Sequence, residues 1–477
     1  MFAWQSDWVF TSHFNHCCGA LLIARNEKIG HAMKPDLLNF YRLAIPVTIQ
    51  ILFLSARNIA DILMTSSLGM IAVASVGISS KAIMVGMVAL GGLASGSSVL
   101  GAQYWGEKNL VGLRKSIWLG LATSVLFVLL PILILFNIFP EHLVSLASAD
   151  QTIVKNASAY LSVFGPAFIF LAINNVLGIA LRVSGRAALA TYASLIGVAL
   201  NVGLSYVFIF GMGSIAAMGI LGAAWATTIS AAIEFLLIYV YFATRINFLL
   251  PKWSDLISIN WAEVKSYAAI SVPSTINGLL WAIGIFIYNI IYGRIGTEAL
   301  AVMASLTPLE SIAASVEQGL ATATAILLGN SLGQSDFTKA RADGFKYLKY
   351  SVCTSLILGI ALIAVMPLFL SIFKLDGDKS QIAILVYLVM VLTFWVKTIN
   401  AVGISGVLRS GGDVGAGLKI DMIGQWGVGI PLALIGAFVL KLSLPIVFAL
   451  VMFEDICKAF LTTSRIKKYL WVKKVTV

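Results

Sequence analysis

Five polar residues on one predicted helix are the best candidates for chemistry in this 477-residue sequence: Gln50, Arg57, Asn58, Asp61 and Thr65. Steps of seven and four residues return to nearly the same angle of an α-helix, so these side chains share one face. The surrounding segment is long and apolar enough to cross a membrane. Because an ionisable residue within a membrane faces the bundle interior or a wet cavity, we interpret Asp61 as a candidate proton-binding group.

Arg57 lies one helical turn before Asp61, which leaves two alternatives open. Desolvation favours the protonated form of a carboxyl group, whereas a neighbouring guanidinium favours the carboxylate. If these effects balance, Asp61 binds and releases a proton as its access to water changes. The alternative is a permanent ion pair that only fixes the helix.

Two later predicted helices carry further polar stripes. The first contains Ser194, Asn201 and Ser205, and the second contains Thr227, Ser230 and Glu234, with Thr228 beside the stripe. These hydroxyl and amide groups can join the hydrogen-bond network of Asp61. They can equally form ordinary hydrogen bonds that hold neighbouring helices together.

The second half of the chain contains acidic and basic residues inside predicted helices. Glu310 and Glu317 lie seven residues apart on one helix face, and Lys397 lies two helices later. Because an unpaired buried charge is costly, we expect Glu317 to pair with Lys397. The pair is either structural or part of a substrate path. Glu454 and Asp455 lie within the last predicted helix.

The composition places these helices in a membrane. Hydrophobic residues make up 59% of the chain and charged residues 11%, with a mean hydropathy of +0.95, whereas soluble domains carry about 25% charged residues. Continuous apolar runs exclude a β-barrel, whose strands alternate polar and apolar residues. The sequence predicts an all-α integral membrane protein with helices at about 38–65, 70–100, 112–139, 152–181, 187–211, 216–244, 263–293, 298–329, 342–372, 380–408, 415–439 and 443–464.

The positions of the charges behind the net charge of +11 indicate how the chain is oriented in the membrane. Lys and Arg concentrate in alternate links, and such links face the cytoplasm in membrane proteins. Both termini are therefore expected in the cytoplasm, and a role in nucleic-acid binding is not. The predicted organisation is a disordered cytoplasmic tail (1–37), a six-helix lobe (38–244), a cytoplasmic linker (245–262), a second six-helix lobe (263–464) and a basic cytoplasmic tail (465–477).

Neither the cysteines nor the histidines predict a metal or catalytic site. Cys17, Cys18, Cys353 and Cys457 are too scattered for a metal-ligand spacing. His13, His16, His31 and His142 all lie outside the predicted helices. The sequence therefore predicts no enzyme and no metal site.

An internal repeat relates the two halves through one constant difference in residue number. This offset pairs Pro46 with Pro273 and Gly106 with Gly333, and it continues without a gap to Leu181-Arg182 and Leu408-Arg409. Because six helices separate equivalent positions, both lobes have the same orientation and are expected to be related by a pseudo-two-fold axis along the membrane normal. Two such lobes are typical of transporters that alternate the access of a site between them.

The sequence resembles the multidrug and toxic compound extrusion (MATE) transporters, in particular their DinF-like branch. The segments that carry the resemblance are Ile45-Pro46, Asp61–Gly69, Gln103–Gly106 with Asn330–Gly333, Leu181–Gly185 with Leu408–Asp413, and Asn201 ahead of Phe210-Gly211. The resemblance implies twelve helices in two V-arranged lobes. It also implies export of bulky cationic or amphipathic compounds in exchange for protons or sodium.

The same resemblance assigns roles to individual residues. It makes Asp61 the proton-coupling carboxylate, Asn201 its amide partner, and Thr227 or Thr228 a member of the network. The sequence departs from the pattern at Ser205, where the family often has a second acid, and this weakens the case for sodium. Tyr288 occupies the position of the second half that the offset matches to Asp61, and it removes the carboxylate there.

These observations predict a multidrug efflux antiporter in which protonation of Asp61 drives substrate release. Pro46 removes a backbone hydrogen bond within the first helix, and its ring collides with the carbonyl of Arg42, so the helix is expected to bend there. The alternative for Pro46 is a permanent packing kink. The alternative function is a flippase or exporter of lipid-linked or other polar lipid substrates on a related fold.

The expected partners are lipophilic cations, amphipathic drugs and membrane lipids. We expect a monomer in the bacterial inner membrane. It needs no cofactor, because a proton gradient drives transport, with sodium as the other possible coupling ion.

Overall fold

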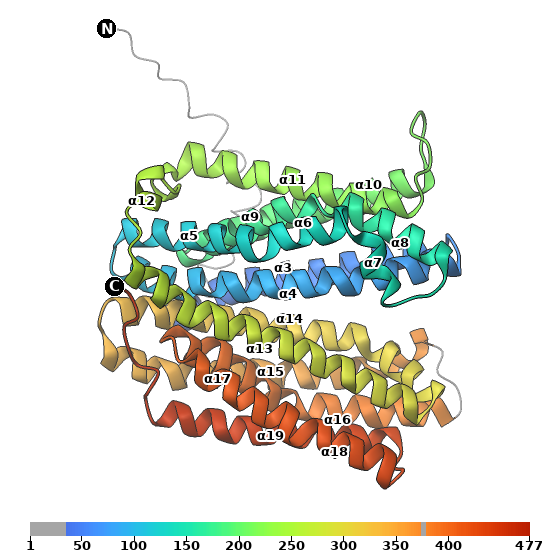
Figure 1. Ribbon diagram of the computed structural model, residues 1–477. Helices are drawn as coiled ribbons and strands as arrows, with labels where there is room; N and C mark the ends of the chain where they lie inside the picture. The colour runs from blue at the N-terminus through green and yellow to red at the C-terminus, as the bar shows by residue number, and fades with distance from the viewer. Residues whose placement is uncertain (1–34, 374–377) are drawn as a thin grey trace.

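The computed structural model describes residues 35–373 and 378–477, which form a bundle of long helices (Figure 1). Residues 1–34 of the expected tail lie outside the described residues. Helix α3 already begins at Pro35, so the last three residues of the predicted tail, 35–37, are helical. The all-α prediction is confirmed.

Six helical spans form the first lobe. They are α3 (Pro35–Ser66), α4 (Met70–Gly106), α5 with η2 and α6 (Leu110–Ser124, Val125–Leu129, Leu130–Asn137), α8 with α9 (Gln151–Phe164, Ala167–Val183), α10 (Ala187–Phe210) and α11 (Ile220–Arg245). The short helix α7 (Pro140–Ser145) connects the third span to the fourth.

Six further spans form the second lobe. They are α13 (Trp261–Ile295), α14 (Thr297–Gly333), α15 (Phe337–Phe373), α16 with η4 (Asp378–Asn400, Ala401–Leu408), α17 with η5, α18 and η6 (Val414–Asp421, Met422–Gly429, Ile430–Leu434, Ile435–Val439) and α19 (Leu444–Lys467).

Most of these spans are long and apolar enough to cross a membrane. Ten of the described helices meet that criterion, and an eleventh does so if α8 and α9, which meet at a 47° bend, count as one span. Helix α19 carries Glu454, Asp455 and Lys458 in its middle, which lowers its hydropathy, and completes the twelve-helix arrangement. The predicted bounds agree with these helices to within a few residues, except that α4 continues to Gly106 and α15 begins at Phe337.

The two lobes pack against each other through equivalent helices. A Cβ atom on Gly92 of α4 would overlap the backbone of Thr275 in α13, and one on Gly319 of α14 would overlap Thr48 in α3. The offset of the repeat relates the two glycines to each other and the two threonines to each other. The repeat therefore produces a pseudo-symmetric interface, in which glycine permits the helices to approach closely.

The lobes are joined at one end of the molecule. This end, hereafter the basic side, carries links 107–109, 184–186, 246–260, 334–336 and 409–413 and the tail 468–477, and it lies at the left of Figure 1. There, Gly106 packs on the carbonyl of Asn330 and Gly333 packs on the carbonyl of Gln103. The largest buried apolar cluster contains residues of both lobes, whereas two smaller clusters lie one in each lobe. The molecule is therefore closed at its basic side.

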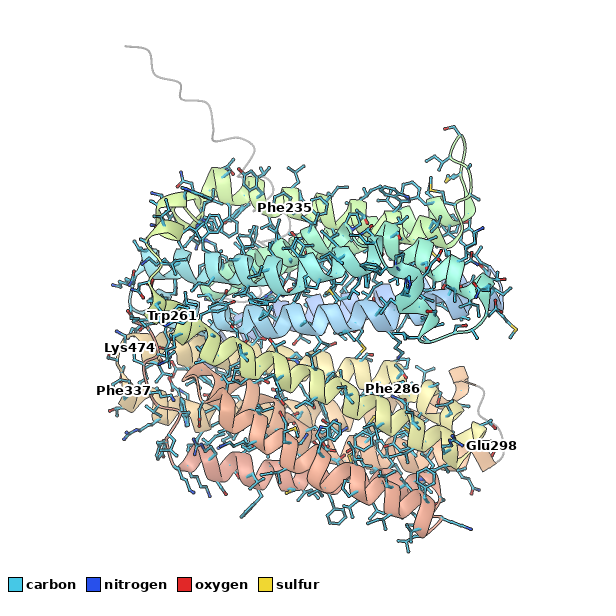
Figure 2. The ribbon with its side chains drawn as sticks, in the orientation of Figure 1. Phe235, Trp261, Phe286, Glu298, Phe337 and Lys474 are labelled. Atoms are coloured by element: carbon cyan, nitrogen blue, oxygen red, sulfur yellow. The ribbon has the colours of Figure 1, made fainter. Side chains whose placement is uncertain are left out.

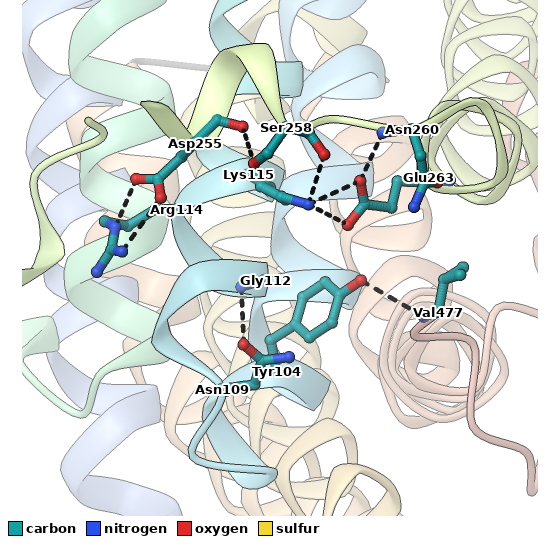
Figure 3. A network of polar contacts seen from close by, with 10 residues as sticks. All are labelled: Tyr104, Asn109, Gly112, Arg114, Lys115, Asp255, Ser258, Asn260, Glu263 and Val477. Carbon is teal, nitrogen blue, oxygen red and sulfur yellow. Dashed lines mark hydrogen bonds and ion pairs between the residues drawn. The ribbon is translucent and has the colours of Figure 1, made fainter. Parts of the chain in front are cut away.

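The linker between the lobes is an ordered part of the basic side (Figure 3). It contains η3 (Asn247–Leu249) and α12 (Trp253–Ile257). Arg114 donates to both carboxylate oxygens of Asp255, at 2.6 and 3.2 Å, and Lys115 contacts Glu263 at 3.0 Å. The hydrogen bond from Arg114 holds the pKa of Asp255 below its usual range.

Candidate functional site

Asp61 lies in the half of α3 that points away from the basic side. Ser205 of α10 donates its hydroxyl to the Asp61 carboxylate at 3.3 Å. Arg57 forms no ion pair with Asp61 within 4 Å, and its buried Nε has no hydrogen-bond partner among the described residues. The permanent Arg57–Asp61 pair that the sequence left open is therefore not present in this conformation.

Asn201 forms the centre of a neighbouring hydrogen-bond network. It is fully buried on α10, and its amide nitrogen donates to Thr227 at 3.1 Å and to Ser230 at 3.3 Å, both on α11. Its side-chain oxygen is buried and has no partner among the described residues. Asn201 does not contact Asp61 directly. Ser205, one turn further along α10, makes the contact that the family resemblance implied for Asn201.

Two other predicted members lie outside this network. Thr228 donates to the carbonyls of Ala224 and Val163, because it faces α8 and not α10. Asn58 is exposed and forms no side-chain hydrogen bond with the described residues. The network around Asp61 is therefore smaller than the sequence suggested.

The same lobe contains a second carboxylate nearer the basic side. Glu234 of α11 lies one turn beyond Ser230 and packs on Gly197 of α10, where an added Cβ would lie 3.0 Å from its Oε2. Arg182, at the end of α9, donates to Gln50 of α3 at 3.5 Å. Polar side chains thus extend through the first lobe from Asp61 toward the basic side.

Pro46 lies within α3, which continues without a break through it. Thr191 of α10 donates its hydroxyl to the Pro46 carbonyl at 2.9 Å. Proline cannot donate to the carbonyl of the residue four positions earlier, so α3 has one fewer internal hydrogen bond at this level.

A cavity of about 660 Å³ lies mainly in the second lobe, between α13, α14, α16 and α19, and Val88, Gly91 and Gly92 of α4 complete its lining. Of the described residues that line it, five are acidic and three are basic. These are Glu310, Glu317, Asp421, Glu454 and Asp455, with Lys397, Arg409 and Lys458.

One group of these charges is fully paired. Lys458 contacts Glu454 at 2.6 Å and Asp421 at 3.3 Å. Tyr288, which occupies the position equivalent to Asp61, donates its hydroxyl to Glu454. Asn277 donates to Asp421 at 2.8 Å. Tyr288 therefore contributes a hydrogen-bond donor where the first lobe has an acceptor.

The predicted pair between Glu317 and Lys397 is not formed. Both residues line the cavity, but they form no ion pair within 4 Å, and Oε1 of Glu317 has no partner among the described residues. Asp455 and Glu310 line the same cavity, and Lys397 forms no ion pair within 4 Å with any of these described carboxylates. Asn400 donates to the carboxylate of Asp455 at 3.1 Å.

The two halves of the chain also match one family of known proteins. Residues 46–207 and 273–435 each match MatE, and the two matches begin at the equivalent prolines Pro46 and Pro273. The chain belongs to the MatE family. Members of this family are transporters and not enzymes.

Relatives within the MatE family span bacteria and animals. The chain is 28% identical over 296 residues to a probable multidrug resistance protein NorM from Agrobacterium fabrum. The matched region covers 59% of this chain and 60% of that protein. It is 26% identical to a multidrug resistance protein NorM from Burkholderia vietnamiensis, over 81% of this chain and 84% of that protein. It is also 26% identical to multidrug and toxin extrusion protein 2 of Mus musculus, over 81% of this chain and 66% of that protein.

Solved MatE-like structures share the fold. An outward-facing MATE family transporter of the MOP superfamily superimposes with a TM-score of 0.83, at 22% identity over 90% of this chain and 96% of that chain. A MOP superfamily transporter from Pyrococcus furiosus superimposes with a TM-score of 0.82, at 21% identity over 90% of this chain and 95% of that chain. These likenesses confirm two six-helix lobes.

Several of the cavity residues escaped sequence reasoning. Lys458 follows Glu454 by four residues, a spacing at which opposite charges pair on a helix. This spacing is the sequence signal that predicts the Glu454–Lys458 pair. Asp421 and Asn277 gave no such signal, because their contact joins α13 to α17. In residues 35–373 and 378–477, no group of three or more His, Cys, Asp or Glu side chains is placed to hold a metal ion.

Proposed function

We propose that this protein is a secondary antiporter that exports cationic or amphipathic organic compounds in exchange for protons. The names of its relatives, multidrug resistance protein NorM and multidrug and toxin extrusion protein 2, support this substrate class. The basic side is then cytoplasmic, by the charge of its links, and the membrane is a bacterial inner membrane.

One observation carries the proposal: the Asp61 carboxylate is half-buried in the membrane part of α3 and accepts a hydrogen bond from Ser205, with no ion pair to any residue that the structure describes. A proton can bind such a group without first breaking a salt bridge. The resemblance of the sequence to the DinF-like branch also supports a coupling role for this carboxylate.

The unpartnered oxygen of Asn201 supplies the second half of the coupling step. An ionised carboxylate only accepts hydrogen bonds, whereas a protonated one also donates. The Asn201 oxygen is buried, has no donor within the described chain and lies one turn from Ser205, so it is an acceptor available to protonated Asp61. This exchange of partners pulls α3 toward α10 and bends it at Pro46, where the helix lacks a hydrogen bond.

The cavity of the second lobe is the proposed resting place of the substrate. Its acidic residues outnumber its basic ones, and Glu310 and Glu317 form no ion pair with any described residue, so they can face an organic cation. The alternative substrate, a lipid-linked sugar with a pyrophosphate, requires a basic cavity. The excess of carboxyl groups therefore favours the organic cation.

The test is efflux of a fluorescent lipophilic cation from everted vesicles, with pH and sodium gradients imposed separately. We expect the pH gradient alone to drive efflux. Efflux driven only by sodium would overturn the proton-coupling proposal, and no efflux under either gradient would overturn the substrate class. Vesicles without the protein measure passive leak.

A further inference from the structure

The segment that follows α19 returns from the second lobe to the first. Trp471 anchors it: this side chain is fully buried and packs on Gly344, where an added Cβ would lie 2.9 Å from its ring. Its indole N–H donates to the carbonyl of Ile466 at 3.3 Å. The chain then runs along the basic side to its C-terminal end, between the lobes in Figure 1. Figure 2 shows Lys474 at this end, together with Trp261 and Phe337.

Gln103 of α4 binds this segment through both its amide nitrogen and its amide oxygen. Its amide nitrogen donates to the carbonyls of Ser410 at 2.9 Å and Lys473 at 3.3 Å, and its oxygen accepts from the Val475 N–H at 2.7 Å. Gln103 is fully buried. One side chain of the first lobe thus holds both the second lobe and the segment that extends from it.

Further contacts tie the segment to the end of α4. Lys474 forms an ion pair with Glu107 at 3.2 Å, and Thr476 donates its hydroxyl to the same carboxylate. The N–H of Val477 donates to the Tyr104 hydroxyl at 3.4 Å, as Figure 3 shows. On the other side, Ser266 of α13 donates to the Val475 carbonyl at 2.7 Å.

These contacts lie beside the glycines that close the basic side. Gly333 packs on the carbonyl of Gln103 itself, so the segment and the lobe interface share one residue. Because residues 473–477 bond to α4 and to α13 at once, α4 cannot leave α13 at this end while they remain bound.

The repeat makes this arrangement asymmetric. Asn330 is equivalent to Gln103, yet its buried side-chain oxygen has no partner within the described chain. The segment that follows α11 docks on its own lobe, where Arg114 binds Asp255 and Lys115 donates to the carbonyl of Ser258. Only the interface around Gln103 is therefore bridged by the segment after a sixth helix.

We propose that residues 473–477 are a latch that holds the basic side closed through Gln103, and that they must leave α4 before this side opens. The proposal rests on the alternating access of the proposed function. It adds a controlling element: the strength of the latch sets how often the site opens toward the basic side.

The first test measures opening directly, without any substrate. Spin labels at exposed Arg245 and Lys467, at the basic ends of α11 and α19, report the separation of the lobes by double electron–electron resonance in nanodiscs. We expect deletion of residues 473–477, which keeps Trp471, and Gln103→Ala each to increase the population with long distances. Asn330→Ala, the matched change in the other repeat, is expected to leave the distribution as in the wild type.

The second test holds residues 473–477 on α4 with a disulfide. In a background with the four native cysteines replaced by serine, Glu107→Cys with Thr476→Cys permits a disulfide between α4 and the segment. We expect oxidation to stop cation efflux and to remove the long-distance population, and reduction to restore both. Each single cysteine variant is the control for oxidation itself.

The outcomes separate the latch from the transport proposal. Unchanged distances in both the deletion and Gln103→Ala, with monodisperse protein, would overturn the latch. So would a fully oxidised double-cysteine protein that still samples the open distances. Because the distances need no substrate, the latch can be upheld even if lipophilic cations are not exported.

Discussion

Asp61 and Tyr288 occupy equivalent positions in the two repeats but have opposite hydrogen-bonding roles. Asp61 accepts a hydrogen bond from Ser205, whereas Tyr288 donates one to Glu454. The acid that Tyr288 contacts, Glu454, comes from α19 and is already bonded to Lys458. The two lobes use the same backbone position for different chemistry.

Replacement of Asp61 tests which lobe couples the proton. We expect Asp61→Asn to abolish pH-driven efflux while leaving the amount of folded protein unchanged, because asparagine keeps the shape but cannot take up a proton. Efflux of a fluorescent cation from everted vesicles measures this. Glu141→Gln, an exposed acid on α7, is the matched control. Wild-type efflux in Asp61→Asn would remove this carboxylate from the mechanism.

Asp255 gives the linker a defined dependence on pH. Because its pKa in the folded protein is lowered, the ion pair with Arg114 contributes fully above the unfolded-state pKa of about 3.9 and is lost as pH falls through the folded value. We expect a spin label at Ser254 to become mobile only in strong acid.

Asp255→Asn removes this charge and is expected to weaken docking of the linker by roughly 1.5–3 kcal/mol. The label at Ser254 should then be mobile at neutral pH, and its mobility should no longer depend on pH. A label that stays rigid in this variant would contradict the importance of the Arg114–Asp255 pair.

At the scale of elements, apolar runs sufficed to predict the helices, because each span must cover the same hydrocarbon thickness. The rotation of each helix about its own axis was harder to predict from the sequence. Thr228 lies next to Thr227, yet only Thr227 meets Asn201. The choice depends on how α10 and α11 pack, which a single polar stripe does not define.

The cavity of the second lobe was the least predictable feature. Tyr288, Asp421 and Glu454 lie on three helices that are far apart in the sequence, and they meet only when the lobe is assembled. The expected partner of Glu317 was therefore wrong, although both Glu317 and Lys397 line one cavity. Sequence showed which charges are buried but not which of them touch.

Pro46 provides a test of helix bending. We expect spin labels at the outer ends of α3 and α10 to change their separation between about pH 8 and pH 5 in the wild type. In Pro46→Ala, which restores the missing donor, the change should be reduced and efflux slowed. A separation that does not respond to pH, or normal efflux by Pro46→Ala, would leave Pro46 as a packing feature.

The contact between the lobes also depends on glycine. A Cβ on Gly319 would lie 2.8 Å from the Ala44 carbonyl and 3.0 Å from the Thr48 nitrogen. We expect Gly319→Ala to destabilise the closed state by about 1–3 kcal/mol through overpacking. The thermal midpoint should fall, whereas Gly293→Ala, which meets nothing within 4 Å, should leave it unchanged. Equal midpoints would show that the interface can relax.

At the scale of the whole molecule, the basic links define an orientation that can be measured. Single cysteines at Lys108 or Lys252 are expected to react with a membrane-impermeant maleimide only from the cytoplasmic side. A cysteine at Ala149, in the link before α8, should react only from outside. Labelling of Lys108 or Lys252 from outside would reverse the orientation.

The unbroken offset between the two repeats has a consequence for how this chain tolerates insertions and deletions. One residue added within a helix rotates everything beyond it by about 100° and shifts it by about 1.5 Å. In α4 or α14 such a change would turn Gly92 or Gly319 away from the opposite lobe and place a larger side chain against Thr275 or Thr48. We therefore expect changes of length to be tolerated only in the links. A library of single-residue insertions should recover folded protein in the link 211–219 but not between Gly92 and Gly106.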